Sequence, residues 1–167
     1  MKYLRSFFES VKSEIPEIFK SNLEDLIVEF KDFGYKVEMR KYMEGGQLEL
    51  EIIVDSTSAL RATKKYMTYD YLSLILGQII DFLPDTGFYV NFIRVENTMM
   101  SNPQDQRKKV FFDHIEESEN PKDFRVFSDW RKKDTEYQNC DVEDHLKGCQ
   151  TTFFSLTINA KQLPVGQ

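Results

Sequence analysis

Two adjacent glycines, Gly45 and Gly46, stand between two stretches of alternating apolar and polar residues. A two-residue hairpin loop needs a positive φ at both positions, which glycine adopts readily, so the sequence predicts a β-hairpin over Tyr35 to Ser56. The loop also fixes which residues face each other. The expected pairs on one face are Val37–Val54, Met39–Ile52, Lys41–Leu50 and Met43–Leu48, and those on the other are Lys36–Asp55, Glu38–Ile53, Arg40–Glu51 and Tyr42–Glu49. We expect the first face to be dry and the second to be wet. A shift of the strand register by one residue would disrupt both faces.

The dry face of this hairpin needs a cover, since an isolated hairpin is only marginally stable in water. Apolar residues recur at helical spacing from Pro16, which suits a first helical position, to Phe33, and a helix-ending Gly34 follows. The sequence therefore predicts a helix over Pro16–Phe33 that lies across the hairpin. A shorter helix is expected before it, over Lys2–Lys12.

Further elements follow along the chain. A third helix is expected from Thr68 to Leu83, ended by the segment 84–87 that contains a proline and a glycine. Apolar residues on both faces indicate an inner strand over Phe88–Val95. Alternating apolar and polar residues indicate a half-buried strand over Phe154–Ala160. Weaker signals predict strands over Lys109–Ile115 and Phe124–Arg131, and a polar loop with one turn of helix over Asp134–Gln150.

These elements predict an α+β fold, in which helices pack on one face of a mainly antiparallel sheet. The 167 residues suffice for one core, so we expect a single domain over 1–167 with a loop-rich C-terminal half and a loop-rich insertion over 97–150. The polar loops would supply surface for contacts with other proteins.

Composition narrows the class of partner. The net charge of −6 makes a nucleic-acid partner unlikely, since binding a phosphate backbone needs a basic surface. We find no apolar stretch long enough to span a bilayer and no signal peptide, so no membrane partner is expected. Two cysteines do not make a disulfide framework, which favours an intracellular, cytoplasmic setting.

The two cysteines lie close to a histidine, in the order Cys140, His145 and Cys149. Thiolate and imidazole are ligands that zinc prefers, and His114 or a nearby carboxylate is the candidate fourth ligand. The spacing lacks the close Cys-x2-Cys pair of common zinc modules, so a polar loop with two ordinary thiols is the alternative. No other cofactor is indicated.

A catalytic set is not evident in the sequence. The same thiols and imidazoles could form a nucleophilic pair, but no nucleophile elbow surrounds them, and no glycine-rich loop precedes a helix to bind phosphate. We therefore expect a protein without enzymatic activity that acts through contacts with other proteins.

Three basic triplets interrupt the acidic composition. They are Arg61, Lys64 and Lys65, then Arg107, Lys108 and Lys109, and finally Arg131, Lys132 and Lys133. If the triplets converge, they offer an interface to an acidic partner, and if they do not, each belongs to a solvated loop or strand end. Separate basic and acidic segments on one chain also suit head-to-tail association, so copies of the chain are the expected partners.

The order of the elements resembles that of the small neck or tail-completion (tail-terminator) proteins of tailed bacteriophages. The elements that carry the resemblance are Pro16–Phe33, Tyr35–Ser56, Thr68–Leu83, Phe88–Val95 and Thr151–Ala160, whereas the 97–150 insertion departs from compact members. The resemblance implies a structural virion component that forms rings between head and tail and has no enzyme activity. The alternatives are a monomeric acidic binding or inhibitor protein of the immunity type and a zinc-stabilised binding module.

Overall fold

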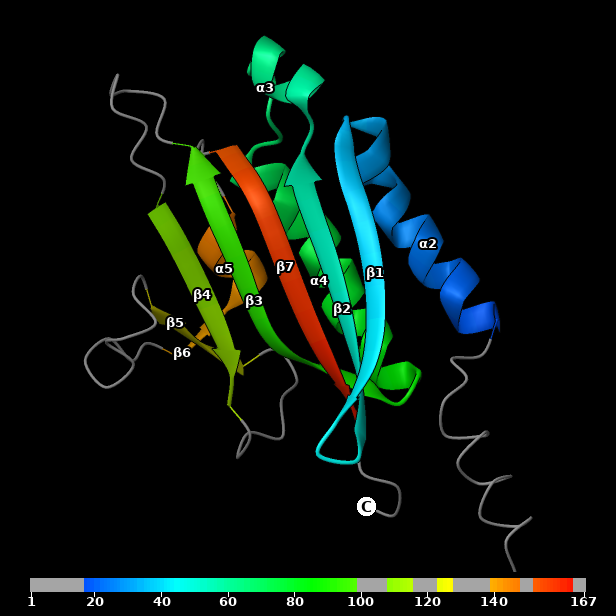
Figure 1. The fold of residues 1–167 in the computed structure, drawn as a ribbon. Coiled ribbons are helices and arrows are strands. Elements are labelled where there is room, and N and C mark those ends of the chain that lie inside the picture. Colours follow the sequence, from blue (N-terminus) through cyan, green and yellow to red (C-terminus); the bar gives the residue numbers. More distant parts are fainter. Residues whose placement is uncertain (1–16, 99–107, 116–122, 128–138, 148–151, 164–167) are drawn as a thin grey trace, which may run out of the picture.

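A computed structural model of the chain describes residues 17–98, 108–115, 123–127, 139–147 and 152–163. Within them, seven strands form one sheet in the order β1-β2-β7-β3-β4-β5-β6, and every neighbouring pair is antiparallel (Figure 1). The strands are β1 (Tyr35–Glu44), β2 (Gln47–Ser56), β3 (Phe88–Thr98), β4 (Lys108–His114), β5 (Asp123–Phe127), β6 (Asn139–Asp141) and β7 (Thr152–Gln162). The helices are α2 (Glu17–Asp32), α3 (Ser58–Thr63), α4 (Tyr69–Asp85) and α5 (Val142–Leu146). The helix predicted over Lys2–Lys12 lies outside the described residues.

The helices α2, α4 and α5 form one layer on one side of the sheet. Helix α2 packs against β1 and α4, and α4 packs against β3, β7 and α5. Figure 1 shows α4 and α5 behind the sheet and α2 beside β1, while α3 stands at one end of the sheet. The predicted α+β fold, with helices on one face of an antiparallel sheet, is therefore confirmed.

Apolar side chains fill the space between the sheet and the helices. The strand register aligns one such row across six strands, made of Met39, Ile52, Ile158, Ile93, Phe112 and Val126. The helices supply buried partners such as Phe30 from α2 and Leu76 from α4. Each of these large side chains stabilises the fold by about 1.5–3 kcal/mol when it is fully buried.

The hairpin has the predicted register. All ten pairs from Tyr35–Ser56 to Glu44–Gln47 are present, and the two loop glycines have φ values of 58° and 83°. The predicted faces are only partly correct. Met43, expected on the dry face, is 55% exposed, because the helix layer ends before the loop of the hairpin. Glu49, expected on the wet face, is only 3% exposed.

Other boundaries differ from the predictions for local reasons. Helix α4 includes the last-turn Pro84 and ends at Asp85, two residues beyond the predicted end. The segment that the sequence left unassigned forms α3, which begins because the side chain of Thr57 accepts a hydrogen bond from the Leu60 amide at 3.2 Å. The expected turn of helix in 134–150 is α5, but strand β6 was not predicted there.

Strand β7 was expected to be half-buried, and this prediction was wrong. It is the third strand in the sheet order, between β2 and β3, and its polar Thr157 and Asn159 are 6% and 1% exposed. A register shift opposite the end of β3 also turns Phe153 into the core. There its ring stacks on Tyr35, with centroids 4.5 Å apart, and meets Phe30 edge-on.

Candidate functional site

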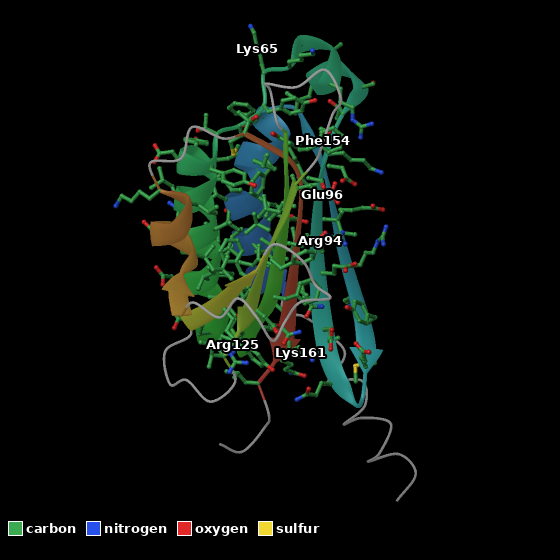
Figure 2. The ribbon with its side chains drawn as sticks, turned by 90° about the vertical axis from the view of Figure 1, so that its left-hand side faces the viewer. Lys65, Arg94, Glu96, Arg125, Phe154 and Lys161 are labelled. Carbon is green, nitrogen blue, oxygen red and sulfur yellow. The ribbon has the colours of Figure 1, made fainter. Side chains whose placement is uncertain are left out.

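The face of the sheet opposite the helices is the candidate site, and we call it the open face. Among the described residues, no helix packs on it, and Figure 2 shows the helices on the other side of the sheet. Alternate residues of each strand occupy this face, so the register defines its rows. The rows are Tyr42, Glu49 and Lys161; then Arg40, Glu51, Asn159, Phe92, Asp113 and Arg125; then Glu38, Ile53, Thr157, Arg94 and Phe111; and finally Lys36, Asp55, Ser155 and Glu96.

Opposite charges face each other along these rows. The cross-strand pairs are Lys36–Asp55, Arg40–Glu51, Glu49–Lys161 and Asp113–Arg125. Each pair of this kind contributes roughly 0.2–1 kcal/mol to sheet stability. The consequence for binding is that charges of both signs are spread over the face, with carboxylates in excess on its hairpin part.

A buried hydrogen-bond network lies on the open face around Asn159, which is 1% exposed. The side-chain amide of Asn159 donates to the Tyr42 hydroxyl and to the Glu49 carboxylate, both at 2.9 Å, and its oxygen accepts from Asn91 at 3.1 Å. The other carboxylate oxygen of Glu49 lies 3.6 Å from the Lys161 ammonium. Glu49 can be buried because these partners replace its hydration.

The network and its carboxylates affect the pKa of Tyr42. Partial burial raises the pKa of Tyr42 to about 12, and a hydrogen bond with Glu49 and the negative charges of Glu49, Glu51 and Glu44 act in the same direction. The phenol of Tyr42 therefore stays protonated at neutral pH, as a hydrogen-bonding group at the rim of the open face.

Arg94 lies in the middle of the open face. Its Nη2 donates to the Thr157 hydroxyl at 3.2 Å, whereas its buried Nε has no hydrogen-bond partner within the described part of the chain. Figure 2 shows Arg94 and Glu96 one after the other along β3, with Phe154 above them. A buried arginine donor without an acceptor lowers the stability of the fold.

The predicted basic interface is only partly visible. Arg61 lies at the end of α3, where its Nε donates to the Ser56 hydroxyl at 3.0 Å and its guanidinium covers the Phe154 ring at 4.7 Å. Lys64 and Lys65 follow it and are exposed. The positions of Lys108 and Lys109 begin β4, and Arg107, Arg131, Lys132 and Lys133 lie outside the described residues. Convergence of the three triplets therefore stays a prediction.

The predicted zinc ligands are also only partly placed. Cys140 belongs to β6 and His145 to α5, while Cys149 lies outside the described residues. His114 ends β4, where its register partner is Phe124, which in turn pairs with Cys140. Phe124 thus separates His114 from Cys140 in the sheet, which does not favour His114 as the fourth ligand. In the described part of the chain, no three potential ligands cluster, and the zinc site stays a prediction.

The sequence did not indicate that Asn159, Lys161 and Arg94 lie at the centre of the open face. Two of them lie on β7, whose neighbours β2 and β3 come from distant parts of the chain. The only local signal was the row of polar residues that alternates with the apolar ones in β7. The Tyr42–Glu49 pair, by contrast, followed directly from the hairpin register.

No protein-family model, curated protein or solved structure matches the chain. For the residues that the structure describes, no helix combines the length and apolar character needed to cross a membrane. The function is therefore inferred from the chemistry of the open face.

Proposed function

We propose that this chain is a non-catalytic assembly protein that acts through protein–protein contacts, and that its copies associate through the open face. The observation that carries the proposal is the Asn159 network. Two polar side chains, Asn159 and Glu49, are buried on the face that no described helix covers, and they hold the more exposed Tyr42 and Lys161 in place. A contact surface benefits from such fixed groups, because little side-chain freedom is lost on binding.

The charge pattern of the open face favours a protein as the partner. A nucleic-acid backbone is bound by surfaces of one positive sign, whereas here acidic and basic residues alternate across the strands. A protein surface with the opposite alternation can match every charge, which gives specificity more than affinity. A second copy of the same chain carries both signs in the required spacing.

The groups on the open face support contact rather than catalysis. Tyr42 is held as a neutral phenol, and Glu49 is bound by Asn159 and Lys161. These interactions fix the side chains in one state, as a docking surface requires. The element order that resembles neck and tail-completion proteins suggests a ring in a virion as the form of the assembly. Such a ring needs a contact that does not close as a dimer.

One observation favours a second function, that of a monomeric acidic inhibitor. The hairpin part of the open face carries more carboxylates than cations: Glu38, Glu44, Glu49, Glu51 and Asp55 against Lys36 and Arg40. The exposed Tyr42 and Met43 lie at the tip of the same hairpin. An acidic surface with exposed aromatic and thioether groups would suit a basic partner protein.

The mass in solution tests the proposal and separates the two functions. Light scattering coupled to size exclusion, over about 1 μM to about 1 mM protein, should give a multiple of the 19.8 kDa chain mass. We expect Ile53→Lys to lower this mass, because Ile53 is a half-buried apolar residue of the open face. The fold should tolerate this change, since the new lysine would stand opposite Glu38.

Leu74→Lys is the matched control, because it places the same charge on an exposed apolar position of α4, on the helix side. An unchanged mass for Leu74→Lys together with a lower mass for Ile53→Lys supports the open face as the contact. A mass of one chain at every concentration would reject self-assembly and leave the inhibitor function.

A further inference from the structure

Strand β1 forms one edge of the sheet, and in the described part of the chain no strand pairs with its outer side. It has ten residues, Tyr35–Glu44, which is long for an edge strand. Long edges expose a row of unpaired amides and carbonyls, and these favour pairing with another chain. The edge of β1 is therefore the second place where a protein partner can add.

The hairpin loop determines which amides of β1 point outwards. A two-residue loop with positive φ at both positions is closed by hydrogen bonds between its flanking residues, here Glu44 and Gln47. Hydrogen-bonded and non-hydrogen-bonded pairs then alternate along the ladder. Every second residue back from Glu44 directs its backbone groups to β2, and the residues between them, including Val37 and Met39, direct theirs to the outer edge of β1.

We propose that a second copy of the chain pairs with this edge, β1 against β1 and antiparallel, around a two-fold axis at Met39. This contact closes as a dimer, so it adds a second, two-fold contact to the proposed self-assembly through the open face, on which the inference rests. Met39 would then face Met39 of the second copy and exchange backbone hydrogen bonds with it. On the open face, Glu38 would stand opposite Arg40 of the second copy, and the two-fold axis would create this pair twice.

Charge complementarity favours this register over those with the axis one residue away. An axis at Glu38 would place Glu38 opposite its own copy and Lys36 opposite Arg40, so like charges would meet in every charged pair. An axis at Arg40 would place Arg40 opposite its own copy. With the axis at Met39, the lysines of the edge avoid like charges, because Lys36 faces Tyr42 and Lys41 faces Val37. An axis at Val37 would also pair opposite charges, Lys36 with Glu38, but it would pair only Tyr35–Met39 of each strand, whereas the axis at Met39 pairs Tyr35–Met43.

The observed side chains are placed for this contact. Within one chain, Arg40 Nη2 lies 3.2 Å from Glu38 Oε2, and the two side chains are 56% and 46% exposed. Both are therefore at the surface and within reach of a neighbour on the free edge. In the proposed register they would form a non-hydrogen-bonded pair, the closer of the two kinds of cross-strand pair. A two-fold axis perpendicular to the sheet also keeps the helix layers of both copies on the same side.

A charge-swap series tests the register by analytical ultracentrifugation. Arg40→Glu would place Glu38 opposite a glutamate of the second copy, so we expect dimer affinity to fall about tenfold or more. The double variant Glu38→Arg with Arg40→Glu restores opposite charges across the axis, and we expect it to recover most of the affinity. Both variants place the same glutamate opposite Glu51 inside the chain, and the double variant also restores the contact between positions 38 and 40 within the chain. Thermal melts of the two variants measure this intrachain effect, so any further difference in dimer affinity comes from the contact between copies.

Two further measurements make the result independent of the charge variants. Met39→Pro removes an outward amide without removing a β1–β2 hydrogen bond, and we expect it to abolish the pairing. In the wild type, hydrogen exchange at the amides of Val37 and Met39 should slow as the protein concentration rises. If the wild type self-associates and the Met39→Pro and Arg40→Glu variants have the same mass in solution as the wild type, the β1 contact is wrong and the proposed function stands. A wild type that stays monomeric overturns both.

Discussion

At the scale of single residues, Asn159 is the side chain on which the open face depends most. It is 1% exposed and joins Tyr42, Glu49 and Asn91 through three hydrogen bonds. Asn159→Ala removes a donor from the buried Glu49 carboxylate, so we expect the free energy of unfolding to fall by about 1–3 kcal/mol. Urea denaturation followed by circular dichroism measures this loss.

Ser155→Ala is the control for Asn159, because Ser155 lies on the same strand and the same face but is only half-buried. We expect this change to cost clearly less. Equal losses for the two variants would show that the network around Asn159 adds nothing beyond the burial of a polar residue.

Because of Tyr42, we expect the free energy of unfolding to fall as the pH becomes alkaline. Its pKa is about 12 in the folded chain, against 10.0 ordinarily, so the unfolded chain loses the phenol proton first as the pH rises. The stabilisation is therefore complete below pH 10 and is lost between pH 10 and about 12. We expect Tyr42→Phe to reduce the slope of unfolding free energy against pH in this window. Burial also raises the pKa of Tyr35, so part of the slope should remain.

At the scale of elements, the loop of the hairpin sets the β1–β2 register. Gly45 and Gly46 have φ values of 58° and 83°, which most side chains avoid. We expect Gly46→Val to lower the free energy of unfolding by about 1–2 kcal/mol, the cost of a left-handed residue. Gly45→Asn should leave it nearly unchanged, since asparagine accepts this conformation. Thermal melts of the two variants test the contrast, and equal losses would contradict the assigned turn.

The hairpin and the long helices could be predicted because their signals are local. Two glycines set ten residue pairs, and helical spacing up to Gly34 placed α2. Strand β6 could not be found in this way, because its three residues carry no alternation and it forms only by pairing with β5. The β-bulge that turns Phe153 into the core is likewise set by β3, which lies more than fifty residues earlier.

At the scale of the whole molecule, the open face could be predicted only in part. The wet side of the hairpin follows from its register. The burial of Glu49, however, depends on Lys161 and Asn159, which belong to β7, the last strand of the chain. The sequence separates these residues by more than a hundred positions. No local pattern shows that β7 inserts between β2 and β3, and so the central network was not foreseen.

The position of β7 in the sheet predicts how the molecule opens. β7 has a neighbour on each side and is buried on both faces, whereas β1 and β6 are the edges. Amides that exchange only by global unfolding lie where every hydrogen bond is shielded, while edges open locally. We therefore expect native-state hydrogen exchange to be slowest in β7, at Leu156 to Ala160, and fastest in β6, with the outward amides of β1 fast at low protein concentration. Exchange in β7 as fast as in β6 would mean that the sheet does not unfold as one unit, and that the network on the open face is not anchored by the core beneath it.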